Sequence, residues 1–157
     1  MMHNETMHEN ALSYMKTLLA IPSPTGYTRD ATDYLLSELE RLGFSPERTR
    51  KGCVYCELGG EGNGLLLSAH VDTLGLMVRS VKSNGRIRYT HVGGGHDATI
   101  ETENCTIHTR DGRTYPGTVQ STKASQHVFR NMGDEPRNDE TLEIVLDEEV
   151  HSAQDVA

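Results

Sequence analysis

A histidine and an aspartate two residues apart, His70 and Asp72, follow the uncharged and largely apolar run 65–69. The length and apolar character of that run predict an interior strand of an α/β sheet. Residues two apart on a strand project to the same side, so the pair is expected to emerge together at a ligand-binding edge of the sheet. A neutral imidazole binds zinc or cobalt, and a carboxylate that accepts its other N–H fixes the ring. The pair predicts a metal site, with a surface or capping pair as the alternative.

Three cysteines, Cys53, Cys56 and Cys105, form the other group of reactive side chains. Cys53 and Cys56 have C-x-x-C spacing, but they lie in a strand-like stretch where residues three apart point to opposite faces. We therefore expect packed free thiols rather than a redox pair or a zinc clip. An odd number without framework spacing is typical of a reducing compartment.

Two further motifs resemble functional sites, but the residues around them argue against such roles. The loop 59–64 has four glycines, but it matches neither the dinucleotide nor the Walker phosphate-binding pattern. It joins two predicted strands, which favours a hairpin turn over a phosphate cradle. The acidic pair Glu148 and Glu149 follows another predicted strand, and we interpret it as part of a solvated charge run.

The elements that would position the His70–Asp72 pair begin with two helices. Apolar residues recur at helical spacing over Glu5–Ala20, and a second helix is expected from about Thr28, with Gly43 at its C-terminal cap. The turn Ser23–Gly26, with two prolines and a glycine in its surroundings, separates them. Strands are expected over 52–58 and 65–69.

From about Thr73 onward the pattern becomes all-β, and we place a domain boundary there. An Asn-Gly turn and an Asp-Gly turn, each between alternating segments, predict two hairpins. A long polar loop is expected over 122–140. The predicted strands are 74–81, 87–92, 105–109, 114–119 and 141–147.

The charge of the chain excludes some partners. Its 157 residues include 23 acids and 15 Lys plus Arg, for a net charge of -8, with no dense basic cluster. This opposes a nucleic-acid partner. No apolar run is long enough to cross a membrane, and the N-terminus lacks the pattern of a signal peptide, so a cytoplasmic protein without a membrane partner is expected. The helix start at Ser152 and the small number of strands in the first part suggest a piece of a longer protein.

Several motifs together resemble a known family, the glutamyl-aminopeptidase-type dinuclear metallopeptidases. Members are also called tetrahedral or deblocking aminopeptidases, or endoglucanase-like proteins. The similarity extends from about residue 12 to the end of the chain. The motifs that resemble the family, in its order, are Ile21–Gly26, Ser68–Val78, Val92–Gly94, Ile107–Gly112 and Pro116–Gly117.

The resemblance implies the N-terminal part of an α/β metallopeptidase sandwich, here residues 1–72, followed by an inserted β-rich, PDZ-like dimerisation domain, residues 73–157, which is expected to be incomplete. It implies that His70 binds one of two divalent metal ions, zinc or cobalt, and that Asp72 orients it as a catalytic-site residue. The other ligands and the general base are expected beyond Ala157, so the chain alone is expected to be inactive. The implied protein trims short peptides as a homo-oligomer, with dimers building to a dodecamer.

Two other functions remain open on the sequence. One is a non-catalytic assembly or peptide-binding module built on the β-rich part, whose strand edges could pair with another chain. The other is a related aminoacylase-like or carboxypeptidase-like metallohydrolase, which fits the Gly75–Val78 continuation less well.

Overall fold

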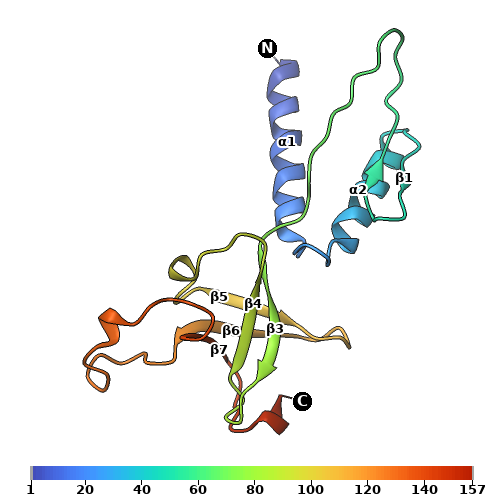
Figure 1. The fold of residues 1–157 in the computed structure, drawn as a ribbon. Helices are drawn as coiled ribbons and strands as arrows, with labels where there is room; N and C mark the ends of the chain where they lie inside the picture. The colour runs from blue at the N-terminus through green and yellow to red at the C-terminus, as the bar shows by residue number, and fades with distance from the viewer. Residues whose placement is uncertain (1, 157) are drawn as a thin grey trace. The chain divides into compact units, whose positions relative to one another are not determined.

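The computed structural model describes residues 2–156 and divides the chain into two compact units, Met1–Leu74 and Gly75–Ala157. The first unit contains helices α1 (Met2–Ala20) and α2 (Arg29–Arg41) and strands β1 (Glu47–Arg48) and β2 (Val54–Tyr55) (Figure 1). The second contains strands β3 to β7. No helix within residues 2–156 is both long and apolar enough to cross a membrane.

The two predicted helices are confirmed. Leu42 closes α2 with its N–H bonded to the Glu38 carbonyl at 3.0 Å, and Gly43 follows at φ +89°, the left-handed conformation that favours glycine after a helix. The Arg41 guanidinium donates to the Tyr14 hydroxyl of α1 at 2.8 Å. The apolar residues of α1 nevertheless remain exposed, among them Met7, Leu12, Met15 and Leu19.

The hairpin predicted from strands 52–58 and 65–69 is wrong. β2 is only two residues long and pairs with β1, in the register Glu47 with Tyr55 and Arg48 with Val54. A turn at Gly52, with φ +87°, closes this ribbon, and Arg48 anchors it to Thr32 of α2 at 3.1 Å. The glycine loop 59–64 therefore does not join two paired strands.

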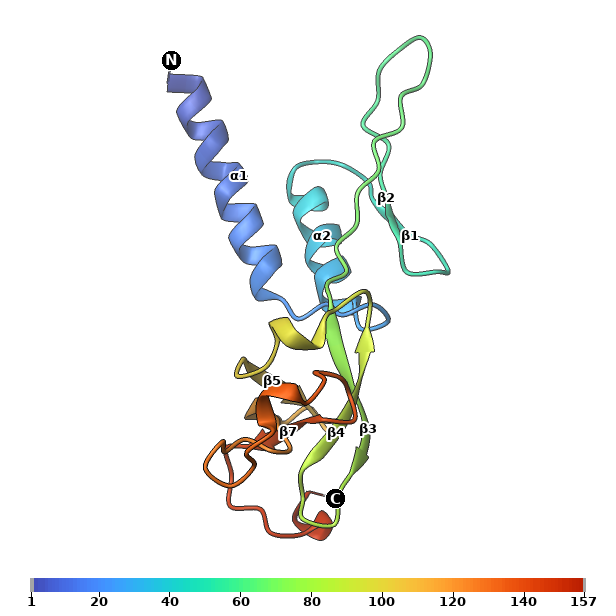
Figure 2. The same ribbon diagram turned by 60° about the vertical axis from the view of Figure 1, so that its left-hand side comes forward.

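Residues 65–69 form no strand. They run as an extended, unpaired segment (Figure 2), and the side chains of Leu65, Leu66 and Leu67 are 85%, 81% and 76% exposed. An interior strand needs neighbouring strands for its backbone groups and covering layers for its side chains. The described part of this unit offers only two helices and a two-residue ribbon, so the predicted buried strand has no partner.

The second unit is a five-stranded antiparallel sheet in the order β3-β4-β7-β6-β5. The predicted hairpins form at their Asn-Gly and Asp-Gly turns: β3 (Gly75–Val81) with β4 (Ile87–Val92), and β5 (Asn104–His108) with β6 (Thr114–Ser121). β7 (Leu142–Leu146) pairs with β6 over five positions but with β4 only at Ile87 and Ile144. Figure 1 shows the β3–β4 ribbon crossing the other three strands.

The core of this unit lies where the two groups of strands meet. Its fully buried residues are Ile87, Tyr89, Val119, Leu142 and Ile144. Two of them come from β4 and two from β7, the strands that share a single ladder position. Side-chain packing thus supplies the cohesion that backbone pairing lacks at this junction.

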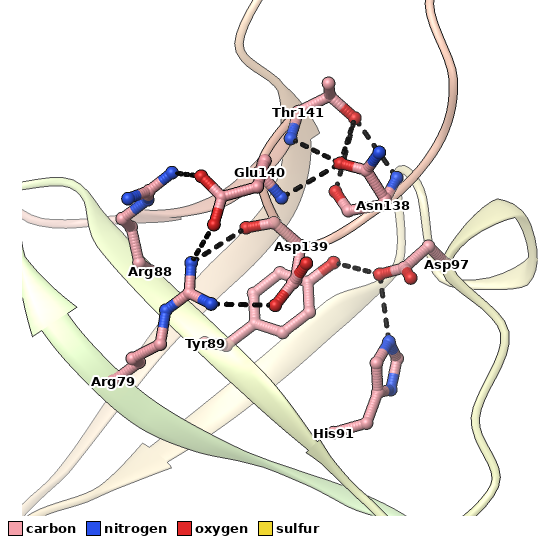
Figure 3. Close-up of polar contacts among 9 residues, drawn as sticks. All are labelled: Arg79, Arg88, Tyr89, His91, Asp97, Asn138, Asp139, Glu140 and Thr141. Carbon is pink, nitrogen blue, oxygen red and sulfur yellow. Dashed lines mark hydrogen bonds and ion pairs between the residues drawn. The ribbon is translucent and has the colours of Figure 1, made fainter.

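Charged side chains also join the β3–β4 hairpin to β7 and the loop before it. The buried Glu143 carboxylate accepts from Lys82 Nζ at 2.6 Å and from an Arg86 nitrogen at 2.8 Å. The exposed Glu140 makes ion pairs with Arg79 and Arg88, and Figure 3 shows this second pairing. We call these two carboxylates and four cations the charge clasp. It connects the parts of the sheet that few backbone hydrogen bonds connect.

Candidate functional site

His70 and Asp72 come together in the structure, although not at the end of a strand. The Nδ1 atom of His70 lies 3.0 Å from Asp72 Oδ1 and 3.1 Å from the Asp72 backbone oxygen. Both neighbours are acceptors when Asp72 is ionised, so the geometry suits a proton on Nδ1. In a neutral imidazole the Nε2 lone pair is then available. The His70 side chain is 84% exposed, so Nε2 is accessible to a ligand.

The turn between the two helices positions the pair. Ser23, which is buried, donates its hydroxyl to the Val71 carbonyl at 2.8 Å, and its own carbonyl accepts from the Thr73 N–H at 2.8 Å. The Thr25 hydroxyl donates to Asp72 Oδ2 at 2.6 Å. Pro24 and Thr73 form a parallel bridge. The rigid turn Ser23–Gly26 therefore holds residues 71–73 although it lies far from them in sequence.

The hydrogen bonds to Asp72 also set its charge. The bond from the Thr25 hydroxyl holds the pKa of the Asp72 carboxyl below its usual range, with a further contribution from His70. Such bonds favour the ionised carboxylate. Asp72 is thus an anion at neutral pH, as the orienting partner of a metal-binding imidazole must be.

This geometry offers one imidazole donor, His70, and a carboxylate that orients it. Across the side chains that the structure describes, no three His, Cys, Asp or Glu residues form a group that could hold a metal ion. One imidazole cannot by itself hold a dinuclear centre, which needs several ligands for each ion. The donor chemistry of His70 and Asp72 fits a divalent metal, and further ligands must complete the site.

The other candidate residues lie apart from this site. The three cysteines are free thiols, and Cys53 is exposed rather than packed. Glu148 and Glu149 are exposed in the segment after β7, in accord with a solvated charge run.

A further polar cluster, in the second unit, has no simple sequence pattern. The Tyr89 hydroxyl and His91 Nε2 both bond to Asp97 Oδ1, at 2.6 and 2.9 Å, as Figure 3 shows. Burial, together with the bond to Asp97, raises the pKa of the Tyr89 hydroxyl. Tyr89 is fully buried, so the cluster fastens the loop after β4 to the core, and the Tyr89 hydroxyl is not an accessible nucleophile. Tyr89 and His91 lie two residues apart on one face of β4, and this spacing is the only indication of the cluster in the sequence.

The comparisons with known proteins identify the family. The pattern of the M42 glutamyl aminopeptidases matches residues 52–157. The chain belongs to this M42 family. The matched segment includes His70 and Asp72 and the whole second unit.

Individual relatives agree with the family match. The chain is 38% identical over 152 residues to YhfE of Bacillus subtilis, covering 96% of this chain and 44% of that protein. It is 26% identical over 146 residues to the glutamyl aminopeptidase of Lactococcus lactis, covering 91% and 41%. A structure of the Pyrococcus horikoshii TET1 peptidase superposes with a TM-score of 0.76 at 22% identity, over 93% of this chain and 43% of that one. The mixed α/β fold of the chain is therefore an M42-type fold, and the chain spans less than half the length of these relatives.

Proposed function

We propose that the chain is part of a metal-dependent aminopeptidase that removes N-terminal residues from short peptides. The observation that carries the proposal is the contact between His70 Nδ1 and Asp72 Oδ1, 3.0 Å apart, within a segment that matches the M42 family. In this proposal Nε2 of His70 binds one of two divalent ions, zinc or cobalt, and Asp72 orients the ring.

The chemistry of the pair supports this assignment. Two metal ions, when bound, activate a water molecule and polarise the scissile carbonyl. Asp72 keeps the Nδ1 proton of His70 in place, which leaves Nε2 as the metal-binding atom and increases its basicity. The remaining ligands and the general base would come from polypeptide beyond the described residues, and the exposed run 65–69 would then gain the neighbouring strands it lacks.

We assign the second unit to the inserted, PDZ-like domain that the family resemblance implies, with assembly into a homo-oligomer as its role. The five-stranded sheet has its own core, and β3 and β5 are its edge strands. The related TET1 peptidase of Pyrococcus horikoshii can assemble into a tetrahedron or a large octahedral shell. A dimer building to a dodecamer is our proposal for the complete protein, which we place in the cytoplasm.

The test uses the longer polypeptide that contains this chain. Removal of metal with a chelator should abolish hydrolysis of aminoacyl substrates, and zinc or cobalt should restore it. His70→Ala should lower kcat/KM at least about 10²-fold, because the site loses a ligand. The control is His127→Ala, which changes an exposed loop histidine. Full activity after exhaustive chelation would exclude the metallopeptidase function.

A non-catalytic assembly or peptide-binding module is the second candidate, because the second unit forms a five-stranded sheet of its own with β3 and β5 as its edge strands. Residues 1–157 alone should show no metal-dependent turnover under either function. The longer polypeptide distinguishes them: aminopeptidase activity supports the enzyme, whereas peptide binding without turnover supports the module.

A further inference from the structure

The two oxygens of the Asp72 carboxylate have different partners. Oδ2 accepts the Thr25 hydroxyl at 2.6 Å, and Oδ1 lies 3.0 Å from His70 Nδ1. A carboxylate can rotate and exchange its oxygens, and a donor fixed on one oxygen restricts that rotation. The Thr25 contact thus directs Oδ1 toward the imidazole.

Thr25 and Ser23 hold the same segment in different ways. Ser23 is buried and bonds only to backbone, through the Val71 carbonyl and the Thr73 N–H, so it fixes the path of the chain. Thr25 is exposed and bonds to a side-chain carboxylate. Loss of the Thr25 hydroxyl therefore removes little packing, and its effect falls on the orientation of Asp72.

We propose that Thr25 is a positioning residue of the metal site, which acts through Asp72 to hold His70 as the Nδ1–H tautomer with Nε2 free for the metal. This inference rests on the proposed metal-binding function of His70. It assigns to the turn Ser23–Gly26 a role in the chemistry of a residue 45 positions further along the chain.

The test is the tautomer of His70 in the 157-residue chain without metal. Long-range ¹H–¹⁵N spectra at a pH of about 8.5, where an ordinary imidazole is neutral, distinguish Nδ1–H from Nε2–H. The spectrum of His70→Ala identifies the His70 signals. We expect the Nδ1–H form in the unaltered chain and a shift of about tenfold toward Nε2–H in Thr25→Val, comparable with the effect of losing such a partner at metal sites.

Two variants control for changes in folding. Thr25→Ser keeps the hydroxyl and should retain the Nδ1–H tautomer. Thr17→Val makes the same substitution on α1, where the threonine hydroxyl bonds to the Ser13 carbonyl, and should leave His70 unchanged. Exchange of the Thr73 amide reports whether the Ser23 contacts persist in each variant.

An unchanged His70 tautomer in Thr25→Val would overturn the inference. So would a Thr25→Ser chain that shows the tautomer shift while the Thr73 amide stays protected. The measurement contains no metal and no substrate, so its outcome is independent of the activity tests. A lack of aminopeptidase activity would not change the tautomer result. A negative tautomer result would likewise not exclude the proposed activity.

Discussion

The two carboxylates of the charge clasp, Glu143 and Glu140, should stabilise the second unit to different extents because they differ in burial. Glu143 and Glu140 each bridge two cations from the β3–β4 hairpin, but the Glu143 side chain is 5% exposed and the Glu140 side chain 57%. The substitutions Glu143→Gln and Glu140→Gln remove one negative charge each with little change of shape. They therefore compare burial at an equal number of ion pairs.

The expected cost is larger for Glu143. A hydrogen bond to a buried charged group contributes about 1.5–3 kcal/mol, but Lys82 and Arg86 are 36% and 39% exposed and can hydrate when the charge is lost. Glutamine also keeps one acceptor. We expect Glu143→Gln to lower the free energy of unfolding by about 2 kcal/mol, or about 10 °C in Tm for a unit of this size. Glu140→Gln should cost about 0.5 kcal/mol, as exposed ion pairs do.

Thermal unfolding followed by circular dichroism, with hydrogen exchange of the β7 amides to identify the second unit, measures both costs. Glu148→Gln, an exposed acid after β7, is the control. At about 1 M salt the small effect of Glu140→Gln should disappear and that of Glu143→Gln should persist, because buried pairs are screened less. Equal Tm values for Glu143→Gln and Glu140→Gln would refute the dependence on burial.

Three further outcomes test other parts of the structure. Gly85→Ala should cost about 2–4 kcal/mol, because Gly85 has φ +80° and an added Cβ would collide with Val150 Cγ1 and lie 2.9 Å from the Ser152 oxygen. Gly112→Ala, at φ +85° in open space, should cost only about 1–2 kcal/mol. Equal costs in urea unfolding would contradict the crowding at Gly85. Burial alone would raise the pKa of Asp97, but the bonds from Tyr89 and His91 outweigh it and lower that pKa. The ionised Asp97 therefore stabilises the fold above about pH 4, and this contribution is lost as the pH falls through the lower folded-state pKa. Asp97→Asn should flatten the acid side of the plot of stability against pH, and a slope equal to that of the unaltered chain would contradict this role of Asp97. Amides 65–69 should exchange with deuterium as fast as an unstructured peptide in the 157-residue chain, and protection there would show a pairing that the structure lacks.

Local sequence patterns predicted the second unit well. The turns at Gly85 and Gly112 need a positive φ, which fixes the place of each hairpin, and the alternating flanks fix the strands on either side. Helix α2 was equally predictable, because the helical spacing of its apolar residues marks its body and Gly43 marks its end. These elements depend on residues close together in the sequence.

Features that depend on distant partners could not be predicted in this way. The run 65–69 has the composition of a buried strand, but composition does not reveal whether neighbouring strands exist. The pairing of Thr25 with Asp72 joins residues 47 positions apart, and the sequence indicates only that each lies in a motif. The His70–Asp72 contact was predicted because the two residues are close in sequence, although the strand expected to present it is absent.

The exposed segment 65–67 also has a consequence for how the chain behaves in solution. Three consecutive leucines with unpaired backbone groups can pair with the same segment of another molecule, as exposed strand edges do. The segment contains no charge or proline to prevent this. Self-association of the 157-residue chain should therefore rise with concentration and begin at this segment, so Leu66→Lys is the substitution expected to keep the chain monomeric.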